Sequence, residues 1–146
     1  MPTSDNLKSR AEKFNSLLLV SIAIHSLLLG CIIYFFTEFF YRTFFSAPMG
    51  NIFFIRQAGL LLFLMGIFYL YPLTDLKRFY NFILPAAFSK VTAVCFLLTN
   101  MEFGPSPGIT YLTAFLDFLM AVVFGFVYLR CRKEFAVNKN KQTLEK

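Results

Sequence analysis

Four apolar stretches of membrane-spanning length constrain this chain more than any other feature of its sequence. They cover residues 15–41, 52–71, 79–100 and 109–130, and short connections that contain Pro or Gly separate them. A helix needs about 20 apolar residues to cross the hydrocarbon core of a bilayer, and Pro and Gly interrupt helices. The composition agrees, because 58% of the residues are hydrophobic and 15% are charged, against about 45–50% and about 25% in soluble domains. We therefore predict an all-α integral membrane protein, a single domain folded as a four-helix bundle.

The basic residues predict how the chain is oriented. They are concentrated before the first stretch, between the second and third, and after the fourth: Lys8, Arg10, Lys13, Lys77, Arg78, Arg130, Arg132, Lys133, Lys139, Lys141 and Lys146. The other two connections contain only Arg42. Because cytoplasmic loops carry an excess of Lys and Arg, we expect both termini in the cytoplasm. We expect the basic tail, residues 136–146, to be disordered and the basic termini to contact anionic lipid headgroups rather than nucleic acid.

Two ionisable residues lie deep inside the third and fourth stretches. Lys90 precedes Asn100 by ten residues, which places it about 15 Å below the outer boundary. Asp117 follows Ile109 by eight residues, about 12 Å below the same boundary. Alanine and glycine share the helix faces of both residues, and small residues allow helices to approach closely in lipid. We therefore predict that both side chains point into the bundle and lie within reach of each other.

Three further polar residues lie within the first two stretches. His25 is about 12 Å from the inner boundary, near the midplane of the bilayer. Arg56 is about 6 Å below the outer boundary, and Gln57 is next to it. We expect these three residues to join the Lys–Asp pair in one intramembrane polar cluster.

The cluster has two interpretations. In the structural one, a buried polar network fixes the order and rotation of the helices, whether or not it adds net stability. In the functional one, the same groups line a pocket that binds a lipid headgroup, a quinone carbonyl or a proton, because ionisable residues at membrane depth are functional candidates. The residues by themselves leave both interpretations open.

Aromatic residues mark the membrane boundaries. Residues 38–45 mix charge with aromatic rings, and are either the outer end of a long first helix or a short interfacial helix, in which Glu38 and Arg42 are spaced to pair. We assign four tyrosines to the interfacial belts: Tyr69, Tyr71, Tyr80 and Tyr111.

The sequence offers little for catalysis. A single histidine and three isolated cysteines, Cys31, Cys95 and Cys131, argue against a metal site and a disulfide framework. The chain has no Gly-rich phosphate loop and no HExxH motif. A membrane enzyme would need His25 or Asp117 as its general base. We therefore expect no catalytic residues, no metal and no cofactor other than a bound lipid or quinone.

The polar and small residues of the last three stretches resemble a known group of proteins. Arg56, Gly59 and Gly66 in the second stretch, Lys90 in the third and Asp117 in the fourth are similar to the DoxX-like or BphX-like small bacterial membrane proteins. The resemblance covers residues 52–130. It implies a four-helix bundle in the bacterial inner membrane and an accessory role beside redox or hydrocarbon-metabolising enzymes, with no defined active site.

Two functions follow as expectations. The first is a small accessory or structural subunit of a larger membrane complex, whose partners are membrane lipids and either another membrane protein or further copies of the chain. The alternative is a binder or carrier of an apolar ligand with a polar head, such as a lipid or quinone. The polar cluster would then anchor the head, and some of the 21 phenylalanines would line the apolar wall.

Overall fold

The computed structural model describes residues 4–45, 48–100 and 107–144, and every regular element in these ranges is helical. The long helices are α1 (Ser4–Phe35), α3 (Ile52–Leu70), α5 (Ile83–Thr99) and α6 (Pro107–Leu144). The short elements are α2 (Thr37–Phe44), η1 (Tyr71–Thr74), α4 (Leu76–Phe79) and η2 (Tyr80–Phe82). Four segments are long and apolar enough to cross a membrane: Glu12–Phe35, Ile52–Thr74, Tyr80–Thr99 and Gly108–Lys133. The all-α class is confirmed, and the protein is an integral membrane protein by the length and hydropathy of these helices.

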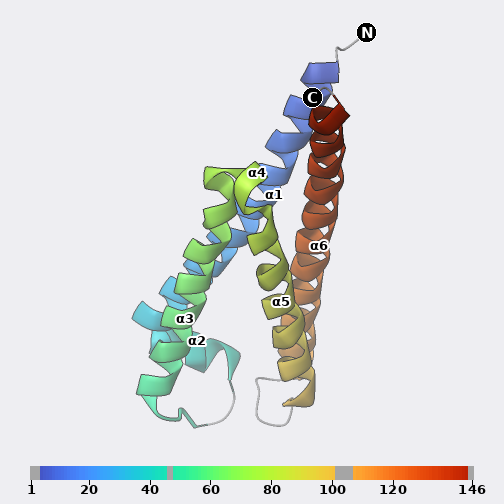
Figure 1. Cartoon of the computed structure of the whole chain (residues 1–146). Coiled ribbons are helices and arrows are strands. Elements are labelled where there is room, and N and C mark those ends of the chain that lie inside the picture. The colour runs from blue at the N-terminus through green and yellow to red at the C-terminus, as the bar shows by residue number, and fades with distance from the viewer. Residues whose placement is uncertain (1–3, 46–47, 101–106, 145–146) are drawn as a thin grey trace.

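The long helices form two hairpins. In the first hairpin α1 packs along α3, and in the second α5 packs along α6 (Figure 1). The start of α1 and the end of α6 lie at the same end of the molecule, called here the terminal end (Figure 1). The two hairpins diverge toward the opposite end, the loop end, where α2 lies (Figure 1).

Glycine makes the close packing of the first hairpin feasible. A Cβ atom added to Gly30 of α1 would lie 2.6 Å from the backbone nitrogen of Phe63 and 2.8 Å from the carbonyl oxygen of Gly59. A Cβ atom added to Gly59 would lie 2.8 Å from the backbone nitrogen of Tyr34. The two backbones therefore touch where both helices lack a side chain, as is common for helices that associate in lipid.

The hydrophobic core lies in the half of the molecule near the terminal end. It combines side chains from all four long helices: Leu19, Ile22, Ala23, Tyr69, Ile83, Ala86, Phe124, Val127 and Cys131. These residues come from the first half of the membrane-spanning part of α1, the end of α3, the start of α5 and the second half of the membrane-spanning part of α6. The hairpins are therefore joined at the terminal end.

Several helix ends differ from the sequence-based boundaries. α1 begins at Ser4, before the first apolar stretch. Of the two alternatives for residues 38–45, a separate short helix is the one that the structure contains. The first stretch breaks at Phe36, whose φ of −115° and ψ of 40° lie outside the helical region, so that α2 is a separate helix. The Thr37 hydroxyl donates to the carbonyls of Ile33 and Tyr34 at 2.7 and 3.1 Å, which satisfies acceptors that the break releases. At the other end, α6 continues through Leu144, across the tail expected to be disordered. Its Lys-rich and Gln-containing sequence lacks Gly and Pro there, which permits a helix.

Candidate functional site

Lys90 and Asp117 form an ion pair between the two helices of the second hairpin. The Lys90 Nζ lies 2.6 Å from the Asp117 Oδ1. The side chains are 6% and 14% exposed, so protein atoms cover most of both. Lys90 continues the buried face that begins with Ile83 and Ala86 on α5, at spacings of three and four residues. The structure therefore brings together the two charges that the sequence places in one layer.

The face of α6 that carries Asp117 is made of small and buried residues. Thr110, Ala114 and Ala121 are all buried on this face. Because these side chains are short, α5 can approach closely enough for the Lys90 ammonium to meet the carboxylate. Gly125, also predicted for this face, has no neighbour within 4 Å of an added Cβ, so the close approach ends before it.

Tyr69 connects this ion pair to the first hairpin. Its ring centroid lies 5.9 Å from the Lys90 Nζ, within the range of a cation–π contact. Its hydroxyl lies 3.0 Å from the Ser89 Oγ. Ser89 donates its only hydroxyl proton to the Ala86 carbonyl at 2.8 Å, so Tyr69 is the donor to Ser89. The ring also packs on Phe124 with centroids 5.0 Å apart.

The sequence-based assignment of Tyr69 to an interfacial belt is therefore wrong. Tyr69 is only 3% exposed and lies within the core. Its position in the sequence contains a usable signal. Tyr69 follows Gly66 by three residues, on the helix face that Gly59 and Gly66 turn toward α1. The helix face of Tyr69 therefore predicts a buried position. Its place near the end of an apolar stretch predicts an interfacial position instead.

The other three residues of the expected cluster lie apart from the pair. Arg56 and Gln57 are exposed on α3, and the Arg56 Nε donates to the Thr37 Oγ1 at 3.4 Å rather than to Asp117. His25 is exposed on α1. The five-residue cluster is thus corrected to a Lys90–Asp117 pair with Tyr69 and Ser89 beside it. The rotation of α1 and α3 is set by their glycine contacts, which turn Arg56 toward α2 and His25 away from the core.

The chemistry of the pair is that of a neutralised contact. The ammonium has a carboxylate and an aromatic face as neighbours, and the carboxylate has the ammonium. Within the described ranges, no group of three His, Cys, Asp or Glu side chains is placed to hold a metal ion, and Cys31, Cys95 and Cys131 form no disulfide there. The ion pair therefore connects α5 to α6.

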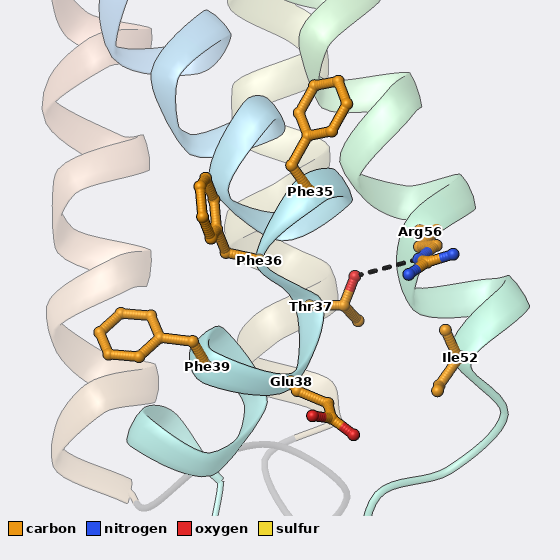
Figure 2. Close-up of a pocket in the computed structure, with 7 residues that line it drawn as sticks. All are labelled: Phe35, Phe36, Thr37, Glu38, Phe39, Ile52 and Arg56. Carbon is orange, nitrogen blue, oxygen red and sulfur yellow. Dashed lines mark hydrogen bonds between the residues drawn. The ribbon is translucent and has the colours of Figure 1, made fainter.

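Two cavities lie away from the pair. One, of about 400 Å³, is lined by apolar and aromatic residues of α3, η1 and η2: Leu64, Ile67, Phe68, Tyr71 and Phe82. The other, of about 380 Å³, lies at the junction of α1 and α2 and is called here the junction cavity. Its lining residues are Phe35, Phe36, Thr37, Glu38, Phe39, Ile52 and Arg56 (Figure 2). The junction cavity is the one that combines charged and aromatic side chains.

The fold and the pair define a class, a small integral membrane protein of two helical hairpins with a buried salt bridge between the two helices of the second hairpin. Comparison of the chain with protein-family models, with curated proteins and with solved structures finds no match in any of the three.

Proposed function

We propose that this protein is a small accessory or structural subunit of a larger assembly in the membrane. The observation that carries the proposal is the position of His25. It lies near the middle of the span Glu12–Phe35 and is exposed on the outside of α1. A polar side chain that faces hydrocarbon has no hydrogen-bond partner, which is unfavourable. A neighbouring subunit with a donor or acceptor at this depth relieves that cost.

The rest of the outer surface supports lateral association. Four large apolar residues lie around His25 on the same face of α1 and are exposed: Leu17, Ile24, Leu28 and Ile32. Ser21, which is also exposed on this face, donates its hydroxyl to the Leu17 carbonyl. Histidine side chains hydrogen-bond between helices in membranes, and the surrounding apolar residues supply van der Waals contact. We call His25 together with Leu17, Ile24, Leu28 and Ile32 the His25 face. The occupant we propose is either another membrane protein or a second copy of this chain.

The alternative function, a lipid or quinone binder at a five-residue polar cluster, has less support. Its anchors would be Arg56, Gln57 and His25 together with the Lys–Asp pair. Arg56 and Gln57 are exposed on α3, whereas His25 is exposed on α1. Lys90 and Asp117 already satisfy each other, so a ligand would have to displace a charged partner from either one.

We also propose that the protein lies in the inner membrane of a bacterium, as the resemblance to DoxX-like proteins implies, and that both of its termini lie in the cytoplasm. The support for the orientation is the charge distribution. Ten described Lys and Arg residues belong to the terminal end: Lys8, Arg10, Lys13, Lys77, Arg78, Arg130, Arg132, Lys133, Lys139 and Lys141. Arg42 and Arg56 belong to the loop end. This excess favours the cytoplasm for the terminal end.

The mass of the protein in its own membrane tests the proposed function. A tagged chain is extracted with a copolymer that cuts out discs of native bilayer, so that lateral partners are retained, and the protein content is weighed by native mass spectrometry. We expect a protein mass well above the 16.9 kDa of one chain, with additional subunits identified by peptide sequencing or a whole multiple of the chain mass. Discs that contain one chain and no other protein contradict the proposal.

A further inference from the structure

The junction cavity combines two opposite charges with aromatic side chains at the end of a membrane-spanning helix. It lies where the span Glu12–Phe35 ends and α2 begins. Arg56 lies four residues after the start of α3, about 6 Å along the helix axis. Both positions place the cavity near the level of lipid headgroups, on the side of the membrane that the loop end faces.

Arg56 is held so that most of its donors remain available. Its Nε donates to the Thr37 Oγ1 at 3.4 Å, and Thr37 is itself fixed by its hydrogen bonds to Ile33 and Tyr34. A guanidinium has five N–H groups in a planar fork, so the bond to Thr37 leaves the two terminal NH₂ groups free. Such a fork binds a phosphate through two parallel hydrogen bonds.

Glu38 supplies the opposite charge in the same cavity. It lines the cavity together with Arg56, and no ion pair joins these two described residues. Figure 2 shows the Glu38 carboxylate and the Arg56 guanidinium on either side of Thr37 and Ile52. Two opposite charges that share a cavity without neutralising each other are complementary to a ligand that itself carries both charges.

The remaining lining suits the apolar part of a lipid. Phe35 lies at the end of α1, Phe36 at the break and Phe39 on α2, and all three rings are exposed. Figure 2 shows the Phe36 and Phe39 rings pointing away from the Arg56 guanidinium. They continue the exposed apolar surface of α1 beyond the end of that helix. Phe rings also attract a cation that lies over their faces. The volume of about 380 Å³ lies within the range of about 300–1,000 Å³ typical of small-molecule sites.

We propose that the junction cavity binds a phospholipid whose headgroup carries a primary ammonium beyond its phosphate, as in phosphatidylethanolamine. Arg56 binds the phosphate, and Glu38 accepts hydrogen bonds from the ammonium. A lipid with phosphate and a neutral glycerol fits less well, because its hydroxyls offer the Glu38 carboxylate hydrogen bonds but no positive charge. A choline headgroup has no N–H to donate to Glu38. This site is independent of the His25 face and of any partner there.

Native mass spectrometry of the whole protein tests this site. The protein is placed in nanodiscs made of equal amounts of phosphatidylethanolamine, phosphatidylglycerol and phosphatidylcholine with identical acyl chains, and the lipids that remain bound after release are counted. We expect phosphatidylethanolamine to be retained about tenfold over either of the others, which corresponds to about 1.4 kcal/mol. Equal retention of the three lipids, or a preference for phosphatidylglycerol or phosphatidylcholine, overturns the proposal.

Three variants separate the roles of the residues. Arg56→Gln removes the phosphate ligand and lowers retention of phosphatidylethanolamine about tenfold. Glu38→Gln removes the preference, so that phosphatidylethanolamine and phosphatidylglycerol are retained equally. Arg42→Gln is the matched control, because Arg42 is exposed on α2 but does not line the cavity, and it leaves the preference unchanged.

The variants also exclude indirect effects. Circular dichroism shows whether each variant keeps the helix content of the parent, and retention is compared only between variants that do. If Arg42→Gln lowers retention as much as Arg56→Gln, the effect is one of surface charge and the proposed site is refuted. It is equally refuted if the lipid preference survives both Arg56→Gln and Glu38→Gln.

Discussion

The Lys90 ammonium of α5 and the Asp117 carboxylate of α6 lie 2.6 Å apart, and Tyr69 of α3 covers the ammonium from the other hairpin. A lone charge at this depth would be very unfavourable, whereas a paired and covered charge is tolerated. The same contact also restricts the rotation of α5 and α6, because a turn of either helix would separate the two groups. The pair therefore links the stability of the second hairpin to its contact with the first.

Removing one member of the pair should destabilise the protein more than removing both. Asp117→Asn leaves the Lys90 ammonium buried without its counter-charge, at a cost of about 3–5 kcal/mol. Replacing both, as Lys90→Met with Asp117→Leu, leaves no buried charge and should restore most of the lost stability. Unfolding in mixed micelles with increasing dodecyl sulfate, followed by circular dichroism, measures each variant. If the double variant loses as much stability as Asp117→Asn or more, the buried ammonium is not the cause of the loss and the prediction is contradicted.

This pair is also the part of the site that the sequence predicts best. Counting residues from the ends of two apolar stretches places Lys90 and Asp117 at one depth, and the small residues near them indicate inward faces. Depth and face are properties of single helices, so they can be obtained from one sequence. The four membrane-spanning helices follow from hydropathy for the same reason.

Tyr69 should contribute through its hydroxyl as well as its ring. Tyr69→Phe keeps the aromatic contacts with Phe124 and Lys90 but removes the bond to Ser89. The expected loss is about 0.5–1.5 kcal/mol in the free energy of unfolding. Tyr111→Phe is the control, since Tyr111 is 57% exposed. An equal loss for both variants, measured by the same unfolding assay, would show that the Tyr69 hydroxyl has no special role.

Glycines of the first hairpin should not tolerate a methyl group. Gly30→Ala places its Cβ against the backbone of α3 at Phe63 and Gly59, and overpacking of this kind costs about 1–3 kcal/mol. Gly125→Ala meets nothing within 4 Å and should be neutral or stabilising by up to about 1 kcal/mol, because Ala favours helix. Unfolding curves for the two variants should therefore shift in opposite directions or by very different amounts. Similar shifts would contradict the close backbone contact.

The orientation of the chain can be measured by thiol labelling. In a chain whose native cysteines are replaced by Ala, Gly50→Cys lies at the loop end and Thr74→Cys lies at the terminal end, and both positions are exposed. A membrane-impermeant maleimide added to intact cells should label Gly50→Cys, and should label Thr74→Cys only after the membrane is opened. The reverse pattern would place both termini outside the cytoplasm.

The contacts that the sequence did not predict depend on how helices are rotated against each other. Arg56 turns toward Thr37 because Gly59 fixes that face of α3 against α1. The same packing leaves His25 outside. The break at Phe36 has no Pro or Gly to announce it. Helix rotation and helix breaks of this kind depend on contacts between two elements, and the hydropathy of a single segment does not predict those contacts.

The central claim is that the His25 face is covered by protein in the membrane. A photo-crosslinking amino acid at Leu28, which is exposed one turn from His25, tests it in living cells. We expect a protein adduct whose yield falls several-fold when His25→Leu is added and stays the same with Leu112→Ile, an exposed apolar position on α6 outside the His25 face. Adducts with lipid alone, or a protein adduct indifferent to His25→Leu, would contradict the account.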